Sequence, residues 1–412
     1  MKNIPERRFA DFFAGIGLAE MALESCGWRA VFANDIDPKK FQVYASNLPG
    51  ERYRVGDVWD LSPEDIPDIE LAWASFPCID LSLAGNRAGL NGKHSSAFWG
   101  FHGILDGLGS RRPQFVVLEN VMGLLRHRKG EALRQVVGAL NGLGYRCDAL
   151  LVDAIHFVPQ SRPRLFVLGS LHAPYAPVLP GVPPSAVRPP DLVRFMLANW
   201  DLRWGFFGFA EPPTRGATVG GIIEDIPTHS AQWWDEAKTA HLVSQMSSPH
   251  LARVRGFLHC DQFRFLTVYR RVRPDGCRAE VRFDGVAGCL RTAVGGSSRQ
   301  IVLRVGGGDI RARWMTPREY ARLQGVPDWF GINVRTNQAL HAFGDAVCVP
   351  VVQWLADNFI SPLWSTVASS GTNGDQSKCA GELIGAAATA RELPSLSPQS
   401  EPGSYSTASR AP

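Results

Sequence analysis

Residues 7–27, RRFADFFAGIGLAEMALESCG, decide the fold of this chain. The segment RRFADFF predicts a strand, and GLAEMALESCG predicts a helix that ends at Gly27. Gly15 and Gly17 lie between the two, where glycines let the backbone approach a ligand near a helix N-terminus. The third glycine of a GxGxxG fingerprint is absent, so a tight strand-to-helix turn also explains them.

The same alternation continues to about Gly169. Apolar runs predict strands at 28–35, 71–76, 114–121 and 164–169, and helical patterns occupy 38–47 and 130–144. Short apolar runs separated by helices are typical of a parallel sheet covered on both faces. We therefore predict a fold of the α/β class.

The pattern changes after about Leu171. Residues 172–190 are rich in proline, and residues 253–313 hold 13 arginines, no lysine and five acids. An arginine surplus of this kind is either a solvated basic face or a surface that follows phosphates and reads base edges. Helical periodicity returns at 349–360, and the composition of 363–412 predicts a disordered tail.

The composition excludes several classes of protein. The 412 residues are 45% hydrophobic, enough for a buried core, and the net charge of +4 permits a nucleic-acid partner without requiring one. The eight cysteines form no CxxC pair and no zinc-finger spacing, so we predict no metal site. We find no signal peptide and no run of about 18 apolar residues, so we expect a cytoplasmic protein with no membrane partner.

Two acids follow predicted strands in the first half of the chain. Asp35 comes about 20 residues after the glycines, where a carboxylate can bind a ribose hydroxyl, and Asp57 ends a third strand. Each acid taken alone is better explained as a helix cap or a turn residue. Together with the glycines, they point to a nucleoside-containing cofactor at the edge of the sheet.

Cys78 stands in ASFPCIDLSLAG, residues 74–85, between Pro77 and a loop that contains glycines. A cysteine is usually a small buried apolar residue. Here the position predicts a sulfur at the carboxyl edge of the sheet, where open α/β folds bind substrates. A thiolate at that edge is a good nucleophile if its surroundings lower its pKa.

Further charged residues fall at predicted strand ends. Glu119 ends the strand at 114–121, and Arg162 and Arg164 lie two residues apart in PQSRPRLFVLG, residues 159–169. On a strand, that spacing places both arginines on one face. They are either a loop cap with a charged edge strand, or a carboxylate with two guanidiniums facing the substrate.

Taken in order, these segments resemble the motifs of the C5-cytosine DNA methyltransferases. FFAGIG, ANDID and GDVW are similar to the first three motifs of that family. FPCIDLS, LENV and QSRPR are similar to its Pro-Cys, Glu-Asn-Val and Gln-x-Arg-x-Arg motifs. RWMTPREYARLQGVPD, which ends at Asp328, and FGDAVCVPVV, residues 343–352, are similar to the ninth and tenth. The resemblance covers nearly all of residues 7–360.

The resemblance implies a Rossmann-like S-adenosylmethionine-dependent methyltransferase sheet and a smaller irregular, mostly β target-recognition domain. The catalytic domain would take residues 1–185 and 334–362, the recognition domain 186–333, and the tail 363–412. S-adenosyl-L-methionine would be the methyl donor and double-stranded DNA the substrate. The implied cofactor residues are Phe13, Gly15, Ile16, Gly17, Asp35, Ile36, Asp57, Val58, Asp345 and Val347.

The resemblance also implies catalytic roles. Cys78 would attack C6 of a flipped cytosine, Glu119 would hydrogen-bond the base, and Arg164, with Arg162 nearby, would hold and polarise it. The implied DNA contacts are Ile79, Ser82, Arg291, Gly296, Ser297 and Arg299. Three positions depart from the family pattern: Ile79 replaces a glutamine, Asp345 an asparagine, and Cys289 a threonine of the recognition pair.

Three other functions fit parts of the pattern. A tRNA cytosine-C5 methyltransferase would share the fold, but the Cys-Phe-Thr segment of that branch is absent from the sequence. A silent DNA-binding module would have no need of Cys78, Glu119 and Arg164 together, and a dinucleotide-dependent oxidoreductase would need a fuller glycine fingerprint. We therefore predict a monomeric DNA (cytosine-5-)-methyltransferase of the bacterial restriction-modification type, functionally paired with a restriction endonuclease.

Overall fold

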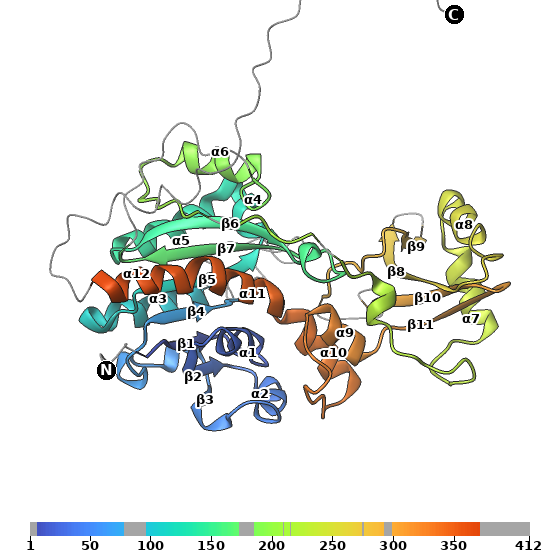
Figure 1. The fold of residues 1–412 in the computed structure, drawn as a ribbon, viewed down its shortest axis with the longest axis horizontal. Coiled ribbons are helices and arrows are strands. Elements are labelled where there is room, and N and C mark those ends of the chain that lie inside the picture. The colour runs from blue at the N-terminus through green and yellow to red at the C-terminus, as the bar shows by residue number, and fades with distance from the viewer. Residues whose placement is uncertain are drawn as a thin grey trace, which may run out of the picture. The chain divides into compact units, whose positions relative to one another are not determined.

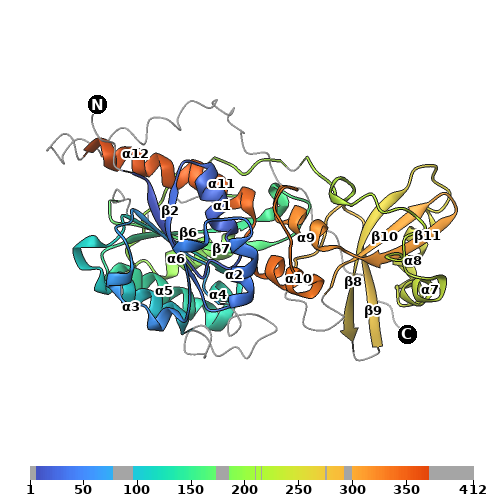
Figure 2. The ribbon, with the colours of Figure 1, turned by 90° about the horizontal axis from the view of Figure 1, so that it is seen from below.

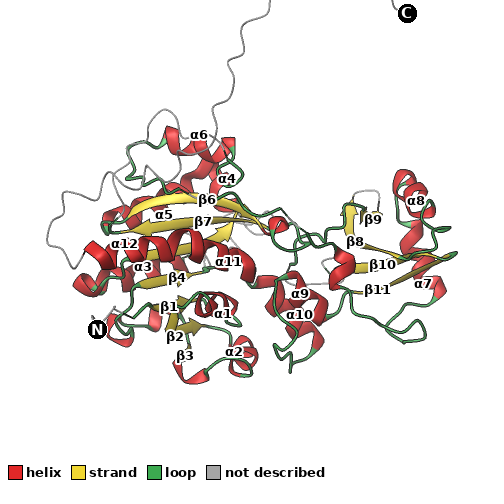
Figure 3. Ribbon diagram, viewed as in Figure 1, coloured by secondary structure: helices red, strands yellow, loops and turns green. Residues whose placement is uncertain are grey.

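The computed structural model describes residues 6–77, 96–172, 185–208, 210–214, 216–273, 276–291 and 299–370 (Figure 1). Helices and strands alternate along the first half of this part of the chain, and a second group of strands comes later (Figure 3). Five predicted positions lie outside the described residues: Cys78, Ile79, Ser82, Gly296 and Ser297.

The first sheet has seven strands in the order β3-β2-β1-β4-β5-β7-β6. They are β1 (Arg8–Phe12), β2 (Arg29–Asp35), β3 (Tyr53–Val55), β4 (Leu71–Ala74), β5 (Phe115–Val121), β6 (Arg146–Asp153) and β7 (Pro163–Ser170). The five strands from β3 to β5 run parallel, as predicted. β7 runs antiparallel to both β5 and β6, so the prediction of a wholly parallel sheet is wrong at this edge.

The antiparallel pair has a simple physical cause. Only residues 154–162 connect β6 to β7, and they contain a three-ten turn at Ala154–His156. A parallel crossover needs about a dozen residues or more, so this short connection produces a hairpin. β6 itself was not predicted from the sequence, because its charged residues Arg146, Asp148 and Asp153 leave only the short apolar run 149–152.

Helices cover both faces of this sheet, as predicted (Figure 2). On β4, Leu71 and Trp73 pack into one layer, whereas Ala72 and Ala74 pack into the other. The first layer includes α1 (Leu18–Ser25), α9 (Pro317–Leu323), α10 (Thr336–Asp345), α11 (Val349–Leu355) and α12 (Ser361–Ser370). The second includes α3 (Ala97–Gly107), α4 (Gly123–Arg126), α5 (Glu131–Gly142) and α6 (Pro190–Ala198), while α2 (Pro38–Ala45) packs near β2 and β3.

The second sheet is antiparallel, in the order β11-β10-β8-β9. It consists of β8 (Arg264–Arg273), β9 (Gly276–Arg282), β10 (Ile301–Gly306) and β11 (Asp309–Trp314). Leu266 and Leu303 share a buried cluster with Leu242 of α7 (Glu236–Ser244) and Val254 of α8 (Ser248–Arg255). This smaller, mostly β unit agrees with the predicted fold class.

The limits of the domains stay proposals, and the packing refines them. Leu192 of α6 and Trp204 are buried in the core of the first sheet, although the sequence places both in the recognition domain. Phe207 is buried in the other core layer of that sheet and its ring contacts Phe359, so we propose that the recognition domain begins after Phe207. Residues 363–370, assigned to the tail, lie in α12, where Trp364 is buried and its ring contacts Trp28.

The helical run Thr336–Thr366 is long and apolar enough to cross a membrane by length and composition alone. However, 72% of its most apolar window is buried inside the fold. Leu340, Val352 and Phe359 pack in the same core cluster as strands of the first sheet. We therefore interpret this run as core helices, whose burial explains their hydrophobicity.

Candidate active site

The turn after β1 has a strained, left-handed backbone. Phe13, Gly15 and Gly17 have φ angles of 59°, 59° and 80°. A Cβ atom at Gly17 would approach Cδ1 of Leu48 to 2.3 Å and Cδ2 of Tyr44 to 2.7 Å, so only glycine fits there. A bulky residue such as Phe13 adopts this conformation at a cost, and such strain concentrates at ligand sites. The predicted glycine turn therefore has the shape of a ligand cradle.

Asp35 holds this turn in place. Its Oδ2 accepts a hydrogen bond from the Gly15 amide at 3.0 Å, and its Oδ1 accepts one from the Asp37 amide at 2.9 Å. The Asp35 side chain is buried, yet each carboxylate oxygen can still accept a further bond from a ligand. Asp35 thus joins the end of β2 to the glycine turn, where we predicted a ribose contact.

Apolar side chains border the same region. Val58 is buried, whereas Ile36 and Trp59 are 62% and 57% exposed. Asp57 caps the short turn that contains Val58 and Trp59, and its Oδ1 accepts a hydrogen bond from the Trp59 amide at 3.2 Å. Large exposed apolar groups beside a strand end suit contact with a flat ring such as a nucleobase.

Asp11 was missed from the sequence, although an acid within the apolar strand RRFADFF was a usable signal. It is 1% exposed, and neither carboxylate oxygen has a hydrogen-bond partner among the described residues. Burial, followed by repulsion from Glu20 and Asp35, raises the pKa of Asp11 well above its usual range. A buried carboxyl without partners is costly unless a ligand completes it, so these residues fit a cofactor that carries donors or positive charge.

Lys40 was also missed, and it connects two predicted positions. Its Nζ lies 3.5 Å from Oδ2 of Asp345 and 3.8 Å from Oδ2 of Asp35. Burial opposes the charge on Lys40, but Asp35 and Asp345 raise its pKa above the ordinary value. The end of α10 is therefore joined to the glycine turn.

Two other predicted cofactor residues turn away from this region. Ile16 is 1% exposed and Val347 is 7% exposed, and both side chains belong to the core cluster between the sheet and its helices. Any contact that they make with a cofactor must therefore come from their backbone. Their apolar character is explained by packing.

Glu119 and Arg164, both predicted site residues, form an ion pair. Nε of Arg164 lies 2.9 Å from Oε1 of Glu119, and the two side chains are 16% and 10% exposed. The antiparallel register of β5 and β7 sets Val121 opposite Arg164. Next to Glu119, Asn120 donates a hydrogen bond to the carbonyl of Phe76 at 3.1 Å, which fixes the chain just before Cys78.

Arg162 lies close to Arg164, because Nη1 of Arg162 and both terminal nitrogens of Arg164 are within 4.0 Å of the Cys289 sulfur, but Arg162 binds other partners than Glu119. β7 begins at Pro163, after Arg162, so strand alternation does not govern the direction of Arg162. Its guanidinium is buried and donates to three backbone carbonyls: Leu290 at 3.0 Å, Gly344 at 3.1 Å and Ala346 at 2.7 Å. Arg162 therefore fastens distant segments together.

Two glutamines extend the connection made by Arg162. Gln160 donates to the Leu323 carbonyl at 2.7 Å and accepts from the Leu290 amide at 3.0 Å. Gln324 donates to the Phe343 carbonyl at 2.6 Å. Both are completely buried. The segment around Leu290 is thus held against β7 and the ends of α9 and α10.

Cys289 lies beside the Glu119–Arg164 pair. Its Sγ is 3.6 Å from Nη1 of Arg162 and 4.0 Å from both terminal nitrogens of Arg164. Burial would raise the pKa of this thiol, but the charges of Arg162, Arg164 and Arg291 lower it below its usual value. We predicted Cys289 only as a departure in the recognition motif, and no sequence signal placed it here.

Two predicted DNA contacts can be examined directly. Arg291 is exposed. Arg299 is partly buried, donates to the Met315 carbonyl at 3.2 Å, and lies with Cζ 5.3 Å from the Trp314 ring centroid. Arg291 is accordingly the better placed of the two to reach a ligand.

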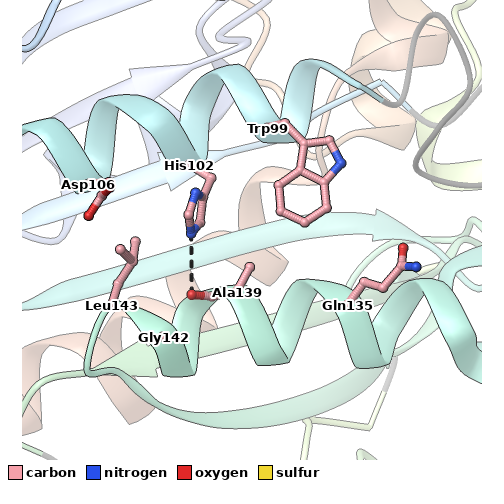
Figure 4. A pocket seen from close by; sticks show the side chains of 7 residues that line it. All are labelled: Trp99, His102, Asp106, Gln135, Ala139, Gly142 and Leu143. Carbon is pink, nitrogen blue, oxygen red and sulfur yellow. Dashed lines mark hydrogen bonds between the residues drawn. The ribbon is translucent and has the colours of Figure 1, made fainter.

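Metal ligands and pockets add no further chemistry to the described part of the chain. No group of three or more His, Cys, Asp or Glu side chains within it is arranged to hold a metal ion. A pocket between α3 and α5 is lined by Trp99, His102, Asp106, Gln135, Ala139, Gly142 and Leu143 (Figure 4). His102 is within 3.3 Å of the Ala139 carbonyl there, and the pocket contains none of the predicted site residues.

The chain is similar to known proteins in both sequence and fold. The chain matches the C-5 cytosine-specific DNA methylase family over residues 7–361. It is 28% identical over 363 residues to the Type II methyltransferase M.NlaX of Neisseria lactamica, covering 86% of this chain and 97% of that protein. It is 27% identical over 367 residues to M.HhaI of Haemophilus parahaemolyticus, covering 88% and 97%. The S. pombe Dnmt2 methyltransferase has a similar fold, with a TM-score of 0.58 and 20% identity over 87% of this chain and 99% of that one.

The chain therefore belongs to the C-5 cytosine-specific DNA methylase family. It is a DNA cytosine-5 methyltransferase that uses S-adenosylmethionine, and the predicted fold class, enzyme and cofactor are confirmed.

Proposed function

We propose that this enzyme methylates C5 of a cytosine that is flipped out of a short, specific duplex sequence. The observation that carries this proposal is the ion pair between Nε of Arg164 and Oε1 of Glu119, at 2.9 Å. Glu119 lies near the carboxyl end of β5, and the glycine turn follows the carboxyl end of β1 in the same parallel part of the sheet. A base inside a duplex exposes neither face of its ring, so it must leave the stack, which costs a few kcal/mol.

The cofactor would be held by the residues around the glycine turn. When bound, S-adenosylmethionine supplies an electrophilic methyl group on a sulfonium sulfur. Asp35 would accept from the ribose, and the backbone of Phe13, Gly15 and Gly17 would approach the ligand closely. Asp57 and Val58, with the exposed Ile36, would contact the adenine. Asp11 supplies the carboxyl that a donor or a positive charge on the ligand would complete.

The nucleophile would be Cys78, which lies outside the described residues. Its thiolate would add to C6 of cytosine, which makes C5 nucleophilic; later the C5 proton is removed and the thiolate leaves. Glu119 would hydrogen-bond N3 and the exocyclic amine, offsetting the charge that builds up on the ring. Arg164 orients Glu119, and Asn120 positions the chain before Cys78 through the Phe76 carbonyl.

Arg162 has a different role in this proposal. Because its guanidinium is occupied by backbone carbonyls, it would act as a positioning residue that keeps Leu290 and the end of α10 in place. The arginine-rich second sheet, together with Arg291 in the connection between β9 and β10, would read the DNA sequence. Ile79, Ser82, Gly296, Ser297 and Arg299 remain proposed DNA contacts.

The direct test is transfer of a labelled methyl group from S-adenosylmethionine to duplex DNA, with a tRNA transcript as the competing substrate. We expect methylated cytosine in one short DNA sequence by bisulfite sequencing. Cys78→Ala should abolish transfer while cofactor and DNA binding remain, because the substitution removes only the proposed nucleophile. Methylation of tRNA but not DNA, or normal turnover by Cys78→Ala, would overturn the proposal.

We further propose that the enzyme works as a cytoplasmic monomer and protects DNA from a cognate restriction endonuclease. M.NlaX and M.HhaI are both named Type II methyltransferases, which supports this setting. DNA from cells that express the chain should resist the endonuclease that cuts the methylated sequence. Sedimentation at low protein concentration measures the oligomeric state.

A further inference from the structure

A basic turn follows the strand that carries Glu119. α4 ends at Arg126, and His127, Arg128 and Lys129 come directly after it. Arg126, Arg128 and Lys129 are exposed. Nη1 of Arg128 lies 3.7 Å from Oε2 of Glu131, and these side chains are 67% and 49% exposed, so water weakens the pair. The turn thus presents a concentrated positive charge.

The backbone of this turn is strained. Arg128 has φ 43° and ψ 46°, and Lys129 has φ 59° and ψ 31°, both in the left-handed region that glycine and asparagine prefer. The next residue, Gly130, is left-handed too, and there glycine has a packing reason: a Cβ would lie 2.5 Å from Cε2 of Phe195. The side chains of Arg128 and Lys129 are exposed, so core packing does not account for their left-handed backbone, and function is the better explanation.

Buried residues anchor the turn on both sides. Leu124 and Leu125 precede it and Ala132 and Leu133 follow it, and all four pack in the core under the sheet. These anchors restrict the directions in which the exposed cations can point. A pre-ordered set of charges loses less entropy when it binds a fixed partner.

The turn lies at the same edge of the sheet as the proposed catalytic pair. β5 ends at Val121, which pairs with Arg164, and α4 starts at Gly123. Glu119 and Arg126 are therefore separated by one strand end and one helical turn. Any duplex whose base reaches Glu119 must bring its backbone close to this edge.

We propose that Arg126, Arg128 and Lys129 contact backbone phosphates of the duplex that carries the target cytosine. This inference rests on the proposed function. Long cationic side chains on a surface turn suit phosphate oxygens, and such contacts position a duplex without reading its sequence. They also release counterions, so each contact adds about 0.9 to the slope of log affinity against log salt.

The test compares wild type with Arg128→Asn/Lys129→Asn. Asparagine accepts the left-handed conformation, so the turn keeps its shape and loses two charges. Binding of a fluorescent cognate duplex is measured by anisotropy from about 50 to 200 mM salt, with S-adenosylhomocysteine present. Arg29→Asn is the matched control. Arg29 is an exposed arginine at the start of β2, so it lies at the amino ends of the parallel strands, whereas the basic turn follows the carboxyl end of β5.

In the double variant, we expect the slope of log affinity against log salt to be smaller in magnitude by about 1.8. The melting temperature should be unchanged or raised, and the ratio of specific to nonspecific affinity should be unchanged. Arg29→Asn should keep the wild-type slope. A wild-type slope in the double variant, or a lower melting temperature together with the lost affinity, would overturn the inference. If wild type itself neither binds nor methylates duplex DNA, the proposed function fails as well; normal wild-type methylation limits the failure to this turn.

Discussion

Replacing Arg162 with methionine tests whether this arginine acts in catalysis or stabilises the fold. Three carbonyls accept hydrogen bonds from the Arg162 guanidinium, and bonds from a charged group contribute about 1.5–3 kcal/mol each. Removal of a buried charge returns several kcal/mol of desolvation. The Ala346 carbonyl also keeps its bond from Gln324. We therefore expect Arg162→Met to lower the free energy of unfolding by about 2–4 kcal/mol.

The assay combines urea unfolding with single-turnover methylation of folded protein. Arg162→Met should shift the urea midpoint downward while the folded enzyme loses less than about tenfold in rate. Arg164→Met is the control with the opposite pattern: it removes the partner of Glu119, so the rate should fall by about 100-fold or more with a smaller change in stability. If Arg162→Met is as stable as wild type but as inactive as Arg164→Met, Arg162 acts on the base and our reasoning is wrong.

Two further predictions concern buried charge around the glycine turn. Lys40→Met leaves Asp35 and Asp345 without the cation that they share. Calorimetry should therefore show that the affinity for S-adenosylhomocysteine falls by about 5–20-fold, or about 1–2 kcal/mol. An unchanged Kd would show that Lys40 does not support the cofactor site. Burial, partly offset by Tyr44 and Arg52, raises the pKa of Glu20 from 4.5 to about 7, so the folded state binds this proton more tightly and stability falls as pH rises between those values. Relative to Glu20→Gln, wild type should lose ~3 kcal/mol of unfolding free energy between about pH 4 and pH 8, and parallel stability curves would contradict this assignment.

Local pattern was sufficient for most of the first sheet. Apolar runs predicted β1, β2, β4, β5 and β7, because a buried strand needs a continuous apolar segment wherever it lies in the fold. The direction of each strand and the strands beside it do not follow from the apolar pattern of that strand. The antiparallel pairing of β6 and β7 depends on the length of the segment that connects them. The packing of α12 depends on a contact between the rings of Trp364 and Trp28, which are far apart in the sequence.

The candidate site divides in the same way. Glu119 and Asp35 were found because Asp35 ends β2 and Glu119 lies two residues before the end of β5, and the carboxyl ends of parallel strands lie together in a sheet. Lys40 was missed because its partner, Asp345, lies in another part of the sequence. Cys289 was placed beside Arg164 only by the fold, since 125 residues separate the two.

The sequence by itself determined the class of enzyme, the methyl donor and the residue types needed at the sheet edge, because the chemistry of nucleophile, carboxylate and glycine turn is local. The tertiary structure alone decided which of two neighbouring arginines faces Glu119 and which binds backbone carbonyls. The physical reason is that a side chain's direction is set by where its strand begins and by what packs against it. Those partners come from segments as far apart as Arg162 and Ala346, which are 184 residues apart along the chain.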